Sequence, residues 1–478
     1  MLKLNELFRS ESRIINDQSG SAIPLIAMGI FSMMSCIGAA IDMSRAQLVQ
    51  ARMSSALDNA GLAAAATAST TDINSEANKY FNANFPTNYM GTTLGTLVVT
   101  PNADNSVLKL SITGSVPTSF MKIVGYNNVA ISASAEITRG SKGLEVILVM
   151  DNTGSMDDPA GGGVSKISAA KSAANSLVNI LFGSNATVPN LYIGLVPFSQ
   201  AVNIGTGHAS WTTSTALNWG TTSWSGCVES RSNGTLTPQY DITDDTPSTR
   251  LFKKYYWPDD GSNNWITTTT SHGRTTTTYN ISSSRGPNLY CPKAVTPMTS
   301  AKATIINSIN AMTTDGNTHI DLGLVWGWRM ISPKWRGLWG GEMNTNNLPL
   351  DYNSPLMNKA IILMTDGDNT ISNGKYSAYD YPSNGQLGSN PCPGGNCSNG
   401  ITELNTRTAT VCSNIKANNS GVIIYTIALG TSISNGVKTM LQNCASKPEY
   451  YFNSPTTDDL ASAFNQIGDS LANLRISK

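Results

Sequence analysis

The chain has 478 residues, enough for about three folding units, which excludes a peptide hormone or a small knottin. Lysine and arginine together number 31, as do aspartate and glutamate, so there is no net charge to hold a polyanion, and nucleic-acid binding is disfavoured. Only 13% of the residues are charged and 40% are hydrophobic, with a mean hydropathy of -0.14, which excludes more than one or two membrane spans.

An uncharged run of 20 positions extends from Ala22 to Ile41. One helical crossing of a bilayer needs about this length, so we expect a transmembrane helix over 22–41. A cleaved signal peptide is the alternative, because Gly38-Ala39-Ala40 resembles a small-residue cleavage site. We favour a retained anchor, because the helical pattern continues without proline beyond the run and predicts one helix from about Ser21 to about Thr67.

Small apolar residues recur every three or four positions beyond the span, a spacing typical of a coiled-coil seam. The seam consists of Ala46, Val49, Met53, Ala56, Ala60 and Ala63. We therefore assign residues 1–69 to a cytoplasmic leader, the transmembrane helix and a helical extension.

The charges that flank the span predict its orientation. Lys3, Arg9 and Arg13 precede it, whereas Arg45 and Arg52 follow it, which favours an N-terminus in the cytoplasm. The cysteines agree, because an even number lies beyond the span, as suits an oxidising compartment. These are Cys227, Cys291, Cys392, Cys397, Cys412 and Cys444. Several connectivities are open, and we favour Cys392 with Cys397, Cys412 with Cys444 and Cys227 with Cys291.

Residues 70–142 contain three alternating segments, TLVVTP, SVLKLSIT and NVAISASAEITR, which are separated by turn-forming residues. Alternation with a period of two predicts strands, so we expect a small, pilin-like β subdomain packed on the long helix. Such a sheet would be marginally stable alone.

From residue 143 onward, short continuous apolar runs alternate with helix-length segments. The runs cover residues 144–150, 191–198, 360–364 and 421–429. Continuous runs are typical of strands buried on both faces, so 143–478 is predicted to be a doubly wound α/β domain. Its final helix should follow Thr456 or Thr457 and bury a stripe from Leu460 to Leu471.

Two segments interrupt this alternation, at about 205–295 and about 371–400, and are interpreted as insertions in loops. The first holds two threonine-rich runs around His272-Gly273, which predict a β-hairpin. Four tryptophans interleaved with arginines follow it: Trp326, Trp328, Trp335 and Trp339. They have two interpretations, a lid packed under the insertions or a partner-binding face, since Trp and Arg are frequent interface anchors.

Acidic and hydroxyl residues follow two of the buried strands. Asp151, Thr153 and Ser155 come after the first apolar run, Asp366 comes after the third, and Thr318 lies at a loop-to-helix junction between them. Ligands of open α/β sheets bind beyond the carboxyl ends of the strands. Because all of these donors are oxygens, the pattern predicts a site for Mg²⁺ or another hard divalent cation such as Ca²⁺ or Mn²⁺.

In this order on an α/β pattern, these five residues resemble the metal-ion-dependent adhesion site of a von Willebrand factor A domain. The resemblance covers residues 143–474, with a threonine at position 153 where serine is commoner. It implies a doubly wound von Willebrand factor A-like sheet that binds a protein partner through the metal.

A second resemblance covers both ends of the chain. Asp17-Gln-Ser-Gly20 before the span, LDNAGLAAAA at 57–66, GWRMISPKWRGLWGG at 327–341 and TDGDN at 365–369 resemble TadG-like pilus assembly proteins of the tight-adherence (Flp pilus) system. This resemblance implies a single-pass protein of the bacterial inner membrane, with its bulk periplasmic or surface-exposed.

The function that follows is a membrane-anchored, metal-dependent protein-binding module for pilus assembly or surface attachment, not an enzyme. Its partner would be a pilus or secretion-system component that donates a carboxylate to the metal. One alternative is a surface adhesin that binds host or matrix ligands directly. A remote alternative is a metal-dependent hydrolase, for which His319 is the nearest histidine but no base is evident.

Overall fold

The computed structural model describes residues 22–66, 73–102, 107–138, 142–161, 163–231, 241–354, 357–417 and 420–476. They divide into two compact units, a first unit within residues 1–140 and a second unit within 141–478. The leader before residue 22, on which the expected orientation and part of the pilus resemblance depend, lies outside the described residues.

The first unit is built on helix α2, Ala22–Ala66, so the long helix expected from the sequence is present. Its only proline, Pro24, lies in the first turn, where the missing N–H has no helical partner to lose. Ile23–Ala65 is the only helix within the described ranges that is long and apolar enough to cross a membrane. Its apolar side chains from Ile23 to Ile37 are largely exposed in the isolated chain, as a lipid-facing segment requires.

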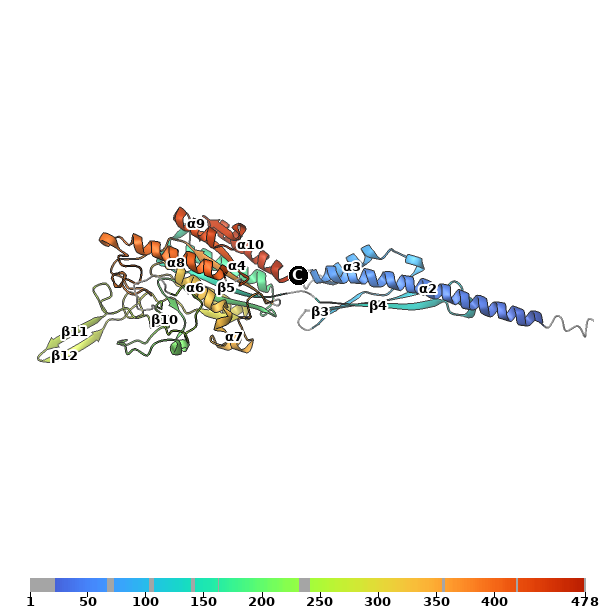
Figure 1. The fold of residues 1–478 in the computed structure, drawn as a ribbon, viewed down its shortest axis with the longest axis horizontal. Coiled ribbons are helices and arrows are strands. Elements are labelled where there is room, and N and C mark those ends of the chain that lie inside the picture. The colour runs from blue at the N-terminus through green and yellow to red at the C-terminus, as the bar shows by residue number, and fades with distance from the viewer. Residues whose placement is uncertain are drawn as a thin grey trace, which may run out of the picture. The chain divides into compact units, whose positions relative to one another are not determined.

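The second half of α2 packs on a small antiparallel sheet and on helix α3, Ile73–Asn84. The strands are β1 (Thr93–Leu94), β2 (Val98–Pro101), β3 (Val107–Pro117) and β4 (Asn128–Thr138). Strand β3 is central, with β4 on one edge and β1 and β2 on the other. Figure 1 shows β3 and β4 alongside this half of α2, while the N-terminal part of the helix continues beyond them. Helix α3 was not predicted.

Five of the six residues in the small-residue seam of α2 are buried within their own unit, and Ala63 is half-buried. Ala46, Val49, Met53, Ala56 and Ala60 are at most 3% exposed, in one core with Leu108, Leu110 and Ile112 of β3. The neighbour of the seam is therefore the chain's own sheet, which explains the small side chains: they let the helix approach the strands closely.

The second unit contains a mixed sheet with the order β10-β9-β8-β5-β14-β15-β16, and β13 pairs with β8. Strands β5 (Gly143–Asp151), β8 (Leu191–Phe198), β14 (Met357–Thr365), β15 (Val422–Leu429) and β16 (Tyr451–Ser454) are parallel. Strands β9 (Val202–Asn203), β10 (Cys227–Val228) and β13 (Thr296–Thr299) pair antiparallel. All four predicted apolar runs form central strands.

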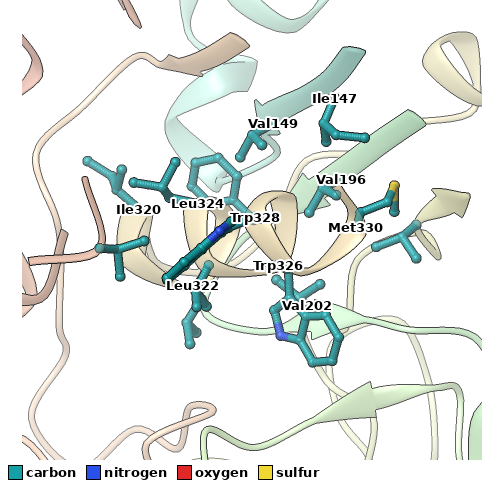
Figure 2. Close-up of a cluster of buried hydrophobic side chains, with 14 of the residues drawn as sticks. Ile147, Val149, Val196, Val202, Ile320, Leu322, Leu324, Trp326, Trp328 and Met330 are labelled. Carbon is teal, nitrogen blue, oxygen red and sulfur yellow. The ribbon is translucent and has the colours of Figure 1, made fainter. Parts of the chain in front are cut away.

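Helices cover both faces of this sheet, which confirms the doubly wound prediction. One face packs against α4 (Lys166–Phe182), α5 (Lys302–Asn310) and α10 (Thr457–Ile476). The other packs against α6 (Ile320–Ile331), α8 (Ser398–Ala417) and α9 (Asn435–Cys444), with α7 (Gly341–Thr345) nearby. Figure 2 shows Ile147, Val149 and Val196 of the strands on one side of α6. In α10, Leu460, Phe464, Ile467 and Leu471 are fully buried, as expected.

The large insertion contains the expected hairpin, β11 (Ile266–Ser271) and β12 (Arg274–Tyr279), which extends away from the rest of its unit (Figure 1). Its threonines pair across the strands, from Thr267 with Thr278 to Thr270 with Thr275. A second hairpin, β6 (Pro159–Gly161) and β7 (Val164–Ser165), precedes α4. Short 3-10 turns complete the fold: Tyr89–Gly91, Met121–Val124, Gly154–Asp157, Thr206–Trp211, Pro333–Trp335, Pro382–Asn384, Pro393–Gly395 and Pro448–Tyr450.

Candidate metal centre

The predicted oxygen donors lie at the carboxyl edge of the sheet. Asp151 is the last residue of β5, and Thr153 and Ser155 follow it in the turn before α4. Asp366 directly follows β14, the parallel neighbour of β5. The carboxyl ends of these neighbouring strands bring residues more than 200 positions apart in sequence to one edge.

A chain of hydrogen bonds joins four of the five predicted residues. The Asp151 carboxylate accepts the Thr153 backbone N–H at 2.9 Å, and the hydroxyls of Thr153 and Ser155 are 3.1 Å apart. The Ser155 hydroxyl then donates to Asp366 Oδ1 at 2.8 Å. Thr365 donates its hydroxyl to the other oxygen of Asp151 at 2.7 Å, a contact the sequence analysis did not identify. The two carboxylates are thus held by hydroxyl groups that are themselves oxygen donors.

Thr318 comes from a third loop, just before α6. That loop contacts the first, because the Gly154 N–H donates to the Gly316 carbonyl at 3.1 Å. It also contacts the loop after β14, since the Thr318 N–H donates to the Thr370 hydroxyl at 2.8 Å and the Thr370 N–H donates to the Thr318 carbonyl at 2.9 Å. Among the described residues, no hydrogen bond joins the Thr318 hydroxyl to the other four donors. The loop is therefore positioned beside the site, with its hydroxyl uncommitted to them.

Both carboxylates of the site are fully buried. Burial, and then the neighbouring charge of Asp366, raise the pKa of Asp151 to about 7, although hydrogen bonds from Thr153 and Thr365 oppose the shift. Two negatively charged carboxylates that are buried away from water repel each other, and a cation between or beside them offsets that repulsion. The site therefore favours a bound cation.

Lys166 supplies part of that positive charge and was not identified from the sequence. It is the first residue of α4, it is 8% exposed, and its ammonium lies 2.8 Å from Asp366 Oδ2 and 3.7 Å from Asp158. Its position at the start of the helix after the acidic turn was the available signal. Within the described ranges no salt bridge joins a basic side chain to Asp151, so one of the two buried carboxylates at this edge has no basic partner there.

The donor set fits a hard divalent cation. The described residues contain no group of three or more His, Cys, Asp and Glu side chains that could hold a metal, so a cage of nitrogen, sulfur or carboxylate ligands is not formed there. What the edge offers is two carboxylates and several hydroxyls, and such oxygen donors suit Mg²⁺, Ca²⁺ or Mn²⁺. With so few charged ligands, a cation held here would keep affinity for a further carboxylate.

His319 follows Thr318 but lies in a different environment. Its side chain is 1% exposed and its ring is 5.7 Å from that of Tyr379. Burial lowers the pKa of His319 to about 3, so the ring is neutral. The His319 side chain therefore packs in the interior, beneath the loop that carries Thr318.

The four tryptophans proposed as a partner face are not on the surface, so that interpretation is wrong. Trp326, Trp328, Trp335 and Trp339 are at most 4% exposed. Trp326, Trp335 and Trp339 pack with each other and with Trp211 of the large insertion, with ring centroids 5.1 to 6.3 Å apart for the contacting pairs. Trp328 instead donates its indole N–H to the Tyr352 hydroxyl at 2.9 Å. The alternative interpretation agrees with the structure, because the cluster is the apolar core between α6 and the insertion.

The disulfides have the favoured connectivity: Cys227–Cys291, Cys392–Cys397 and Cys412–Cys444. The first closes the large insertion, the second lies within the small one, and the third joins α8 to α9. Cys36, within the apolar half of α2, is free.

Comparison with known proteins gives one family match. Residues 20–67 match the model of the putative Flp pilus-assembly TadE/G-like family. The matched segment covers the apolar part of α2 and its extension, so the chain resembles this family in its membrane anchor. No curated protein sequence matches the chain at a significant level.

Solved structures with distant likeness include proteins of pili. The von Willebrand factor domain of the type V pili tip protein Mfa5 from Porphyromonas gingivalis is 14% identical over 71% of this chain and 97% of its own, with a TM-score of 0.36. A mutant of the PilB minor pilin from Streptococcus sanguinis is 14% identical over 82% of each chain, with a TM-score of 0.34.

A further solved structure with distant likeness is that of proximal thread matrix protein 1 from the mussel byssus, with a zinc-occupied MIDAS motif. It is 15% identical over 71% of this chain and 47% of its own, with a TM-score of 0.30. The chain also spans only 34% of the pilus adhesin SpaC from Lactobacillus rhamnosus GG, at a TM-score of 0.35. Likeness at this level says nothing about what the present chain binds.

Proposed function

We propose that this chain is a membrane-anchored, divalent-metal-dependent protein-binding module for the assembly or surface attachment of a tight-adherence (Flp-type) pilus. Residues 22–41 would anchor it in the bacterial inner membrane with the N-terminus in the cytoplasm. The rest, which comprises the β subdomain of 70–142 and the von Willebrand factor A-like domain of 143–478, would lie in the periplasm or at the surface. The family match of the anchor segment and the three disulfides support this placement.

The observation that carries the proposal is the hydrogen-bonded chain from Asp151 through Thr153 and Ser155 to Asp366, with two buried carboxylates and one lysine. A bound cation would supply an electrophilic centre for a partner carboxylate. The hydroxyls of Thr153, Ser155 and Thr318 are neutral ligands, so they would not neutralise the positive charge of the cation. Asp151 and Asp366 hold it in place from the ends of two rigid strands.

A protein partner with an exposed Asp or Glu is the chemistry this arrangement recognises. The partner's carboxylate would complete the coordination shell, which makes binding reversible and dependent on the metal. We expect the partner to be a component of the pilus or of its secretion system, because residues 20–67 match the pilus-assembly family.

Replacement of Asp151 in intact cells tests the proposal. In an Asp151→Ala strain, pilus assembly and adherence should fail although the protein accumulates in the membrane, and chelation of divalent ions should reproduce the defect. The matched control is Asp157→Ala, which removes an exposed carboxylate from the same loop. Crosslinking in both strains should trap the partner only in the control.

Normal pili and normal adherence in the Asp151→Ala strain, at ordinary protein levels, would show that the metal edge is not the binding site. Normal pili with lost adherence would instead place the function at the cell surface, as an adhesin that contacts host or matrix ligands directly.

A further inference from the structure

The loop between β3 and β4, residues 118–127, is fixed to α2 by one carboxylate. Asp42 accepts the backbone N–H groups of Ser119, Phe120 and Met121 at 2.8 to 2.9 Å, and its side chain is almost fully buried. Arg45, one turn further along the helix, donates to the Ser119 hydroxyl at 2.7 Å. The loop is therefore held at the level of residues 42–45 of α2.

The 118–127 loop also contacts α2 at Gly38, one turn closer to the N-terminus than Asp42. A Cβ atom added to Gly38 would lie 2.5 Å from the Cβ of Phe120, so only glycine permits this approach. The loop also closes on itself, because Tyr126 N–H donates to the Met121 carbonyl at 3.0 Å and Thr118 N–H donates to Asn127 at 3.0 Å. A rigid loop is thus placed beside the end of the apolar run, which finishes at Ile41.

The same loop exposes large apolar side chains. Ile123 is 73% exposed, Tyr126 64%, Val124 49% and Phe120 46%. Isolated exposed apolar residues are ordinary, but four within seven positions form a patch that water does not favour. The patch also includes an exposed lysine, Lys122.

We propose that the 118–127 loop is a second membrane contact, which places Phe120, Ile123 and Val124 in the bilayer interface on the side where α2 emerges. An apolar run of 20 residues spans about 30 Å, the thickness of the hydrocarbon core, so a loop fixed at residues 38–45 lies at its boundary. Tyr126 has the amphipathic ring that suits the headgroup level, and Lys122 complements lipid phosphate.

Lipid is the occupant because the patch is continuous with the lipid-facing surface of α2 through the Gly38 contact. Asp42 can lie this close to the interface because three N–H groups and Arg45 satisfy its charge. The inference depends on α2 crossing the membrane and is independent of the metal centre.

Lipid quenching in the full-length protein tests this directly. In a Cys36→Ser background, where the other cysteines are in disulfides, Ile123→Cys is labelled with an environment-sensitive NBD fluorophore and the protein is placed in nanodiscs of phosphatidylcholine and phosphatidylglycerol. We expect a blue-shifted emission that loses most of its intensity when the lipids carry a shallow doxyl quencher. Lys109→Cys, exposed near the far end of β3, is the matched control and should stay unquenched.

Equal, unquenched emission at both positions would place the loop in water and overturn the proposal. A blue shift at position 123 without quenching by lipid would also overturn it, because a protein surface, either a second copy or a partner, would then cover the patch.

Discussion

Strands β5 and β14 carry charged residues at both of their ends, and the two ends differ in charge balance. At the amino end, Glu145 and Lys359 are register neighbours that form a buried ion pair, and the Leu350 N–H donates to the same glutamate at 2.8 Å. At the carboxyl end, Asp151 and Asp366 are both buried, and Lys166 contacts only the latter.

This difference separates a structural site from the proposed binding site on the same two strands. The amino end pairs each charge with one of opposite sign, so it needs no ligand. At the carboxyl end, no basic side chain among the described residues forms a salt bridge with Asp151, and a bound cation would supply the missing positive charge. Burial alone does not distinguish the two ends, because all four strand-end residues are at most 2% exposed.

The largest effect on stability should follow removal of one partner of the ion pair at the amino end. Lys359→Met leaves Glu145 buried without its partner, so the second unit should lose about 3 to 5 kcal/mol of unfolding free energy. Chemical denaturation of the full-length protein in detergent, followed by tryptophan fluorescence, reports on this unit, since all nine tryptophans lie within it.

The double variant Glu145→Leu with Lys359→Met removes both charges and should recover most of that stability. A single variant within about 1 kcal/mol of the wild type would contradict the assignment of this pair as a structural site.

A fourth buried acid, Glu229, extends the comparison, because it forms no salt bridge with a basic side chain among the described residues. Burial raises the pKa of Glu229 to about 7, although a hydrogen bond from Tyr376 and the charge of Lys253 oppose the shift, and Asp380 adds to it. The folded protein then binds a proton that the unfolded chain releases near pH 4.5, so unfolding free energy should fall as pH rises from about 4.5 to about 7.

Glu229→Gln removes this titration. At pH 8 the variant should be more stable than the wild type by up to about 3 kcal/mol, and at pH 4 the difference should largely vanish. Denaturation midpoints across this range provide the measurement, with the exposed Glu449→Gln as control. A wild-type profile that is flat between pH 4.5 and 7 would contradict the proposed protonation of Glu229.

At the carboxyl end the comparison predicts lost binding with little lost stability. Asp151→Ala should weaken Mg²⁺ or Mn²⁺ binding by at least about a hundredfold in calorimetry, since it removes one of two carboxylates. Its unfolding free energy without metal should change by about 1 kcal/mol or less, because the repulsion with Asp366 disappears together with the hydrogen bonds. A large loss of stability with intact metal binding would assign this end to structure instead.

The sequence predicted the parts of the molecule that depend on local pattern. Continuous apolar runs identified the four central strands, and strand ends identified Asp151 and Asp366. The small strands β13 and β16 were missed because strands of four residues leave no clear period. Helix α3 was missed because its buried face has only three residues: Ile73, Ala77 and Phe81.

Contacts distant in sequence were harder to predict. Lys166 contacts Asp366, 200 positions away, and its position after the acidic turn does not by itself indicate that distant partner. Trp326 and its neighbours have the composition of an interface, yet Trp211 and Phe252 of the large insertion cover them. Composition indicates that such a cluster is suited to burial in a contact, whereas only the fold decides whether the chain itself covers it.

A substitution of Lys166 changes the charge at the carboxyl end in the opposite direction to Asp151→Ala, because it removes a positive charge. Lys166→Gln removes the ammonium from Asp366, so repulsion of an incoming cation falls and the carboxylate becomes free to bind it. We expect about tenfold tighter Mg²⁺ binding in calorimetry. Lys171→Gln is the control on the same helix, since Lys171 donates to the carbonyls of Asn310 and Met312 instead. Weaker binding in the Lys166 variant would show that the lysine helps to hold the site.

The smallest effect should come from Thr318, which is a neutral donor from the third loop. Thr318→Ala removes one hydroxyl and no charge, and the two hydrogen bonds that its backbone N–H and carbonyl make with Thr370 remain and position the loop. Metal affinity should therefore fall about three- to tenfold, well short of the Asp151 effect, while Thr318→Ser, which keeps the hydroxyl, should bind nearly as the wild type does. The order of the two losses matters more than their size. If Thr318→Ala weakened binding as much as Asp151→Ala, the charge imbalance at the carboxyl end of β5 and β14 would not be what holds the cation. Equal affinity in the alanine and wild-type proteins would instead remove Thr318 from the coordination shell and leave a site formed by the first and second loops alone.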